Sequence, residues 1–147
     1  MSKISIGIDP DSTAHGVAIY IDGKLSVLKS MPLMELFAFI TMDDFNIEDA
    51  TAHIENVCGQ NAAFYKKGVK NAAAGTAINR SIGKCQQAQL EVERMLGWVG
   101  VEVVRHRISK SWKDKNGKKK FELATKWKGR SNEDTRSAAY FGMLGVT

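Results

Sequence analysis

Residues 4–9 constrain the fold of this chain more than any other segment. Isoleucine recurs there at every second position, which predicts a strand with one apolar face. Asp9 follows directly, and Pro10 restricts Asp9 to extended backbone, so we expect the strand to end at this residue. The pattern therefore places a carboxylate at the carboxyl end of the first strand.

Two more strands are expected to follow in an antiparallel meander. Residues 15–21 and 24–29 are rich in apolar and β-branched side chains. The dipeptide Asp22-Gly23 separates them, and this pair is the strongest short signal for a hairpin turn. The chain thus opens with three strands that pair with their sequence neighbours.

The remaining chain alternates predicted helices and strands. We expect a helix from Pro32, a buried strand at 49–55, a helical stretch at 61–96 interrupted near Gly75 and Gly83, a strand at 101–104, a helix from Ser109, a lysine-rich loop around 116–117, and a final helix capped by Ser131 or Asn132. This order predicts an α/β fold in which the first and fourth strands lie side by side. A length of 147 residues fits one domain spanning residues 1–147.

The sequence predicts neither a membrane-spanning protein nor a secreted one. The sequence is 44% apolar and 25% charged, which is ordinary for a folded globular protein. It contains no run of 18 apolar residues, and its first residues lack the basic-then-apolar pattern of a secretory signal. We therefore expect a cytoplasmic protein that does not contact a membrane.

Positive charge is concentrated in one block. Residues 105–130 contain 11 Lys or Arg and two acids, a net charge of +9 in a chain of net charge +5. Such a localised block indicates a phosphate-binding surface, although runs of charge are also common on plain solvated surfaces. Trp112 and Trp127 interrupt the block, and aromatic side chains among basic ones favour a nucleic acid partner.

Two further acids can join Asp9 at one place. Glu55 ends the strand at 49–55, and Asp134 lies in the first turn of the final helix. If the first and fourth strands are parallel neighbours, their carboxyl ends meet where open α/β sheets form sites. Three converging carboxylates repel one another unless a divalent cation such as Mg²⁺ or Mn²⁺ neutralises them. Two such ions would promote hydrolysis of a phosphodiester bond, so the residues indicate a metal-dependent nuclease.

The same residues carry a resemblance to a known family. Residues 6–12, 54–57 and 134–142 resemble the motifs of RuvC-type Holliday junction resolvases, and the chain looks closest to their short phage and prophage versions. In the last motif, Ala139 and Gly142 follow Asp134 at the family's spacing. The resemblance implies an RNase H-like fold, with a five-stranded mixed sheet whose first three strands are antiparallel, flanked by helices. It also implies a bacterial cell or a phage-infected host.

The resemblance implies an activity and a set of roles. The expected protein is a structure-specific endodeoxyribonuclease that resolves four-way junctions with two metal ions held by Asp9, Glu55 and Asp134. Lys113 matches the segment that brings a lysine to the scissile phosphate, so it joins the expected catalytic residues. Two symmetric incisions need two active sites, which implies a homodimer. No nucleotide cofactor is expected.

Three positions depart from the family pattern. Asp11 stands where a glycine is usual, and Cys58 stands where many members have an aromatic residue that stacks on the opened junction. Ser131 occupies the position of a second acid one helical turn before Asp134. The site then works with three carboxylates, or the fourth-ligand position is met by Ser131, by its neighbour Asn132 or by Glu133.

Further residues are candidates for binding DNA. The candidate phosphate contacts are Lys66, Lys67, Lys70, Lys113, Lys118, Lys119 and Lys120, and the candidate stacking residues are Phe64, Tyr65 and Trp112. Contacts to the backbone carry affinity without sequence information, so we expect recognition of branch shape. The alternatives are a solvated loop for residues 118–120 and core packing for Phe64 and Tyr65.

Two other classes of function remain open. The sequence Gly7-Ile8-Asp9 followed by a Ser/Thr turn also resembles the first phosphate loop of actin-like ATPases and sugar kinases, which need a second related domain. A non-catalytic protein that binds branched DNA would keep the basic block and could carry a serine at position 131.

Overall fold

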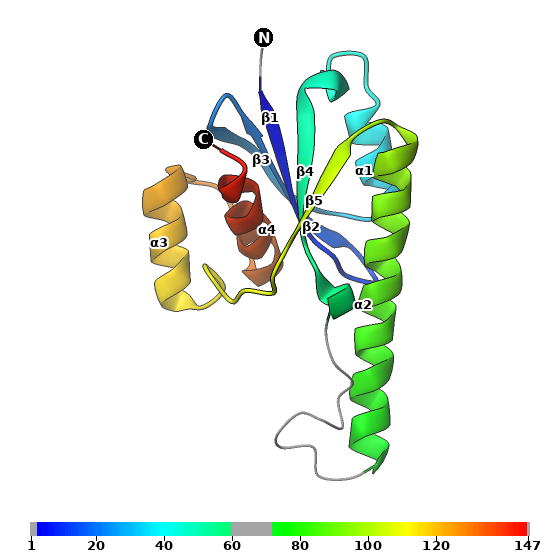
Figure 1. Cartoon of the computed structure of the whole chain (residues 1–147). Helices are drawn as coiled ribbons and strands as arrows, with labels where there is room; N and C mark the ends of the chain where they lie inside the picture. Colours follow the sequence, from blue (N-terminus) through cyan, green and yellow to red (C-terminus); the bar gives the residue numbers. More distant parts are fainter. Residues whose placement is uncertain (1–2, 60–71, 147) are drawn as a thin grey trace.

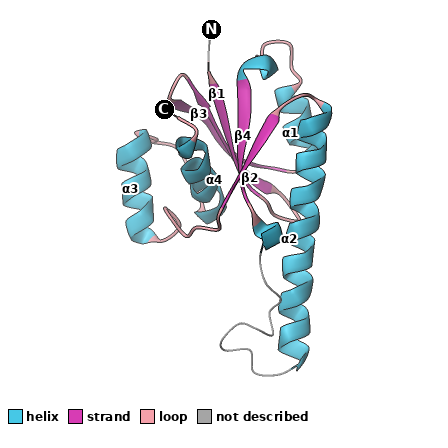
Figure 2. Cartoon of the chain, viewed as in Figure 1, coloured by secondary structure: helices cyan, strands magenta, loops and turns pink. Residues whose placement is uncertain are grey.

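The computed structural model describes residues 3–59 and 72–146, with side chains in the long helix described from residue 79. Its elements in chain order are β1 (Ile4–Asp9), β2 (His15–Ile21), β3 (Lys24–Met31), α1 (Leu33–Ile40), the short 3-10 helix η1 (Ile47–Asp49), β4 (Ala50–Glu55), a second 3-10 helix η2 (Val57–Gly59), α2 (Ala72–Trp98), β5 (Glu102–His106), α3 (Lys115–Thr125) and α4 (Glu133–Leu144). The strands form a central layer with helices on both sides (Figures 1 and 2). Within the described residues, no helix is both long enough and apolar enough to cross a membrane.

The five strands form one mixed sheet in the order β3-β2-β1-β4-β5. Strands β1, β2 and β3 pair antiparallel, whereas β4 pairs parallel with β1 and β5 pairs parallel with β4. Asp22 and Gly23 both adopt positive φ, at 50° and 83°, as the predicted hairpin turn requires. This arrangement confirms the expected RNase H-like sheet.

The two faces of β1 differ in what covers them. The isoleucines of β1 belong to a buried cluster with Leu36 and Ile40 of α1 and with Val92 and Leu96 of α2. The opposite face of the sheet is covered by α4, with α3 packed outside it (Figure 1). The alternation along β1 therefore separates an apolar core from the face that carries Asp9.

Close packing brings α4 onto this second face. A Cβ atom at Gly7 would collide with the backbone of Ala138 and Gly142 in α4. A Cβ atom at Gly142 would in turn press on the ring of Tyr20. Helix and sheet thus approach through facing glycines, and the Tyr20 hydroxyl donates a hydrogen bond of 2.6 Å to the Ala139 carbonyl.

Several sequence-based boundaries were wrong. Helix α2 runs without interruption through Gly75 and Gly83, because packing of its later turns against the sheet outweighs the weak helix propensity of glycine. Strand β5 extends two residues beyond the expected end, to His106. The part of the predicted helical stretch at 61–71 lies outside the described residues.

The basic block folds differently from the expectation. No helix begins at Ser109; α3 begins at Lys115, because the Asp114 side chain caps it by accepting a hydrogen bond of 2.6 Å from the Gly117 amide. The residues expected to form a lysine-rich loop therefore form the first turns of α3. Of the two proposed caps for the last helix, Asn132 is the one used, and it forms a reciprocal capping box with Thr135.

Candidate active site

Asp9 and Glu55 end two neighbouring parallel strands. The register pairs Ile8 of β1 with Ile54 of β4, so the next residue on each strand reaches the same edge of the sheet. Both carboxylates are buried, each with a relative exposure of 5%. The predicted meeting of these two acids is therefore present in the fold.

Asp134 reaches the same edge from α4. Asp9 pairs with Gly16 of β2, and a Cβ atom at Gly16 would collide with the backbone carbonyl of Asp134. Asn132 starts the helix two residues earlier, so Asp134 lies in the first turn directly above this strand pair. Glycine at position 16 is what permits this approach of α4 to the end of β1.

The acids influence one another electrostatically. Burial, partly offset by Lys113 and the Ser137 hydroxyl, raises the pKa of Asp9 from 3.8 to about 6, with Asp134 adding a smaller upward effect. Burial and then the charge of Asp9 raise the pKa of Glu55 from 4.5 to about 7, and Asp134 again adds to the rise. A positive charge placed at this edge would stabilise both ionised carboxylates.

Lys113 supplies one positive charge. Its Nζ atom lies 3.6 Å from Oδ2 of Asp9, and the lysine side chain keeps 29% of its surface exposed. The ammonium lowers the pKa of both Asp9 and Glu55, so its charge acts on both buried acids. Lys113 therefore lies beside Asp9, and its expected contact with the scissile phosphate stays a prediction.

Two carboxylate oxygens retain free coordination capacity. In the part of the chain that the structure describes, Asp9 Oδ2, Glu55 Oε2 and Ser137 Oγ are buried without a hydrogen-bond partner. Buried unpartnered oxygens are rare in folded proteins and often mark a missing ion or water. Hard oxygen ligands of this kind fit Mg²⁺ or Mn²⁺. Across residues 3–59 and 72–146, however, no three His, Cys, Asp or Glu side chains lie close enough to form a complete metal-binding group.

The positions considered for a fourth ligand are occupied differently. The hydroxyl of Ser131 accepts a hydrogen bond of 3.0 Å from Nη1 of Arg136. Asn132 uses its side chain to cap α4. The neighbouring side chain, that of Glu133, is exposed to solvent.

The candidate DNA-binding residues divide into two groups. Lys118, Lys119 and Lys120 are exposed on α3, in a helix rather than in the solvated loop that was the alternative. Lys66, Lys67, Lys70, Phe64 and Tyr65 lie outside the described residues. The three lysines of α3 are therefore accessible, and contact with DNA by the residues of either group stays a prediction.

Trp112 packs within the protein. Its ring centroid lies 5.7 Å from that of Phe121 in α3 and 5.6 Å from that of Tyr140 in α4. These contacts join the segment before α3 to both helices, and the side chain is half-buried. Packing accounts for this tryptophan, and stacking on DNA stays a prediction.

Sequence reasoning missed two residues of this site. Ser137 lies one helical turn after Asp134, so the spacing of three residues was a usable signal for its position beside the acids. Arg136 forms hydrogen bonds to the backbone of residues 112 and 113, and nothing in the sequence indicates that contact.

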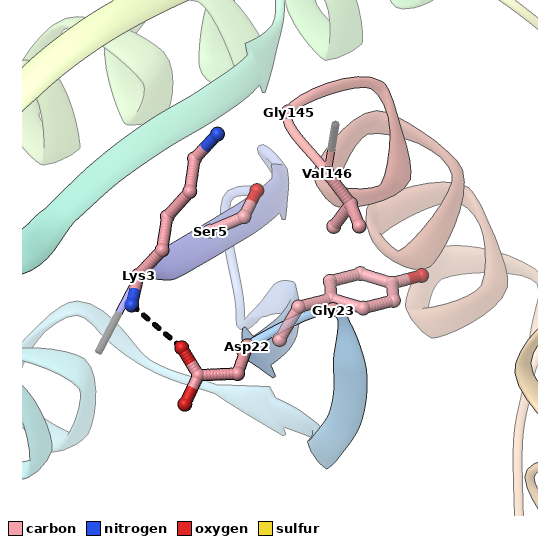
Figure 3. A pocket seen from close by; sticks show the side chains of 7 residues that line it. Lys3, Ser5, Asp22, Gly23, Gly145 and Val146 are labelled. Carbon is pink, nitrogen blue, oxygen red and sulfur yellow. Dashed lines mark hydrogen bonds between the residues drawn. The ribbon is translucent and has the colours of Figure 1, made fainter. Parts of the chain in front are cut away.

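A pocket lies at the other end of β1. It has a volume of about 390 Å³, and Lys3, Ser5, Tyr20, Asp22 and Val146 contribute to its lining (Figure 3). The Lys3 amide closes one side by donating a hydrogen bond of 2.9 Å to Oδ1 of Asp22. Because Lys3 precedes β1 and Asp9 ends it, this pocket is separate from the carboxylate site.

Comparison with solved structures identifies similar folds. The structure of Thermus thermophilus RuvC superposes with a TM-score of 0.52 at 13% sequence identity, covering 95% of this chain and 91% of that chain. T. thermophilus RuvC in complex with a Holliday junction substrate superposes with a TM-score of 0.55 at 12% identity, covering 98% and 97%. No protein-family model and no curated protein sequence matches the chain. The similarity confirms the expected fold over nearly the full length of both chains.

Proposed function

We propose that this chain is a structure-specific endonuclease that cuts branched DNA and resolves four-way junctions. The observation that carries the proposal is that Asp9, Glu55 and the first turn of α4, which includes Asp134, lie at one edge of the sheet, with Lys113 beside Asp9. Support comes from the fold, which is similar to that of a RuvC bound to a Holliday junction substrate.

Asp9, Glu55 and Asp134 would hold Mg²⁺ or Mn²⁺, as a pair of ions, with the three side chains closer together than they lie in the described residues. When bound, such ions supply an activated water and stabilise the leaving oxygen in phosphodiester hydrolysis. The observation that favours this role is that Glu55 Oε2 and Asp9 Oδ2 are buried without a hydrogen bond, although Asp9 Oδ2 lies 3.6 Å from the Lys113 ammonium. A pKa near 6 or 7 means that these carboxyl groups hold protons at mildly acid pH, and those protons must leave before a cation binds.

The other residues of the site would bind and orient the DNA. Lys113 points an ammonium at the carboxylate edge, where it can contact the reacting phosphate. The exposed lysines 118–120 of α3, the helix that follows Lys113 in the chain, would contact phosphates further along an arm. Contacts of this type give affinity that depends on salt and on shape rather than on base sequence.

A four-way junction has two strands to cut, so the proposed protein acts as a homodimer with one carboxylate site in each copy. The proposal includes no nucleotide cofactor. An actin-like ATPase or sugar-kinase activity has no support beyond the short motif at Gly7-Ile8-Asp9.

One assay tests the proposal. Purified protein is incubated with end-labelled four-way, forked, flapped and linear duplexes, with and without Mg²⁺. Paired nicks placed symmetrically across the four-way branch, seen only with the metal, are the expected result. Cutting confined to flaps or forks would restrict the function to a general structure-specific nuclease.

A second candidate is a protein that binds branched DNA without cutting it. The observation in its favour is Ser131, which stands at the position of a family acid and is bonded to Arg136. Tight binding of the four-way junction with no cleavage in Mg²⁺ or Mn²⁺ would establish this candidate in place of the endonuclease.

A further inference from the structure

Arg136 is a buried cation that bonds to the backbone beside Lys113. Its relative exposure is 7%. Nε donates to the carbonyl of Trp112 over 2.8 Å, and Nη2 donates to the carbonyl of Lys113 over 2.6 Å. The third nitrogen, Nη1, donates to the Ser131 hydroxyl over 3.0 Å. The guanidinium therefore joins α4 to two successive carbonyls of the segment that precedes α3.

Arg136 is unusual because it is a buried charge with no carboxylate partner among the described residues. Among residues 3–59 and 72–146, no carboxylate lies within ion-pairing distance of Arg136. A buried charge without an opposite charge is costly and needs full hydrogen bonding to be tolerated. Each of the three guanidinium nitrogens of Arg136 donates one hydrogen bond to a neutral acceptor, and two of these acceptors are backbone carbonyls of one short segment.

The segment is also held from its other side. A Cβ atom at Gly117 would lie 2.5 Å from the Trp112 Cα atom, so the first turn of α3 packs directly on this backbone. Trp112 has φ of 67°, a conformation that is uncommon for a residue with a bulky side chain. Such a conformation persists only where the surrounding structure enforces it. The fork of Arg136 and the close contact with Gly117 together enforce it.

The position of Lys113 depends on this backbone. The side chain starts at the residue whose carbonyl Arg136 holds, and it ends 3.6 Å from Oδ2 of Asp9. The Ser131 hydroxyl fixes the orientation of the Arg136 guanidinium by accepting a hydrogen bond from Nη1. We propose that Arg136 is a positioning residue that fixes the Trp112–Lys113 backbone so that the Lys113 ammonium stays at the carboxylate site. This role rests on the proposed function, because Lys113 acts there on the reacting phosphate.

The role also gives a reason for serine at position 131. The Ser131 hydroxyl accepts one hydrogen bond from Nη1, while Nε and Nη2 donate to the backbone carbonyls. A carboxylate at the same position would attract the fork into a bidentate ion pair, in competition with those carbonyls. The serine at position 131, where the family pattern has an acid, is therefore compatible with the hydrogen bonds from Arg136 to the backbone.

A double-mutant cycle tests the role in catalysis. Arg136→Lys keeps the charge but loses the planar fork, and Lys113→Met removes the ammonium. We expect Arg136→Lys to lower kcat on a four-way junction by about ten- to a hundredfold with a small change in KM, because a displaced contact acts on the reacting geometry. In the Lys113→Met background, the same substitution should change kcat less than about twofold, since the two residues act as a unit. An equal loss in both backgrounds would overturn the proposal.

A second readout needs no activity. Hydrogen exchange is measured on the metal-free, DNA-free protein, for the amides of residues 111–114. Exchange there should become faster in Arg136→Lys than in the wild type. It should be unchanged in the matched control Arg105→Lys, which breaks a comparable fork to Glu93 on the other side of the sheet. Unchanged exchange in Arg136→Lys would show that the guanidinium does not hold the segment.

The two readouts separate failure of the inference from failure of the proposed function. A wild type that cuts no branched DNA refutes the endonuclease, and hydrogen exchange then decides alone whether Arg136 holds the segment. If Arg136→Lys does not fold, Arg136→Gln replaces it in both experiments, because the amide keeps a donor without a buried charge.

Discussion

The ammonium of Lys113 lies 3.6 Å from Oδ2 of Asp9, although the two residues belong to opposite halves of the chain. The contact places a positive charge against a buried acid whose neighbour Glu55 is also buried. Both acids have a raised pKa despite this lysine, so one ammonium does not compensate for the burial of two carboxyl groups. A divalent cation bound beside Asp9 and Glu55 would supply further positive charge and stabilise their ionised forms.

Replacing Asp9 with asparagine should separate cutting from binding. Asp9→Asn keeps the size of the side chain and removes the charge, so we expect cleavage of a four-way junction to fall by about a hundred- to a thousandfold. Affinity for the junction should change little, because the lysines of α3 remain. Single-turnover cleavage and gel-shift titration measure the two quantities.

The matched control for that variant is Asp43→Asn. Asp43 is exposed in the turn after α1, so the same chemical change there should leave both cleavage and binding at wild-type values. Retention of full cleavage by Asp9→Asn would exclude the carboxylate site as the site of the reaction.

Much of the sheet could be predicted because its signals are local. The alternation along residues 4–8 and the Asp22-Gly23 turn each depend on neighbours in sequence, and both were right. Asp134 could be placed on the last helix because Asn132 is a strong capping residue two positions earlier. The placement of Asp9 and Glu55 at one edge of the sheet followed from the strand order rather than from the acids themselves.

Most of the errors concern features that depend on distant contacts. The first turn of α3 was missed because its lysines resemble a solvated loop. The cap by Asp114 was a local signal that could have been used, whereas the burial of Phe121 in the core depends on distant contacts. The course of α2 through Gly83 depends on packing of residues further along the helix. The contact of Arg136 with the Lys113 carbonyl joins segments that no local pattern relates.

The same Asp9→Asn substitution should stabilise the metal-free protein at alkaline pH. The pKa of Asp9 rises from 3.8 to about 6 on folding, so the folded state binds more protons than the unfolded state between these values. Stability therefore falls as pH rises from about 4 towards 7, and the penalty persists above that range. Asparagine removes the penalty, which should raise the free energy of unfolding by about 1–3 kcal/mol at pH 8.

Urea denaturation at pH 8 and at pH 4 measures this effect. The gain should shrink at pH 4, where the wild-type carboxyl group is protonated in the folded state. An equal gain at both pH values would mean that the charge of Asp9 is not its cause.

Mg²⁺ should stabilise the wild type in a pH-dependent manner. Binding requires ionised carboxylates, and the pKa of Glu55 is about 7 while that of Asp9 is about 6. The rise in unfolding midpoint on adding Mg²⁺ should therefore be larger at pH 8 than at pH 5.5. At a Mg²⁺ concentration of about 100 times Kd, the stabilisation should approach ~2.7 kcal/mol. A shift of equal size in Asp9→Asn would place the ion elsewhere.

The basic surface of α3 should contribute to affinity through salt-dependent contacts. Lys119→Gln should weaken binding of a four-way junction and lower the slope of log affinity against log salt by about 0.9 if the lysine contacts one phosphate. Lys24→Gln is the control, because Lys24 is exposed beside the hairpin turn at the far end of the sheet. Equal slopes for the two variants would remove α3 from the binding surface.

Substitution of Gly7 should disrupt the site through the packing of α4. A Cβ atom at Gly7 would collide with the Ala138 carbonyl, which is backbone and cannot rotate away, so Gly7→Ala should destabilise the fold by about 2–4 kcal/mol. Gly83→Ala is the matched control, because no atom lies within 4 Å of its added Cβ and alanine favours the helix, giving about 0.5–1 kcal/mol of stabilisation. Chemical denaturation measures the free energy of unfolding of both variants.

Since α4 carries Asp134, a folded Gly7→Ala protein should also lose cleavage while Gly83→Ala retains it. Equal stabilities for the two variants would contradict the close approach of α4 to β1.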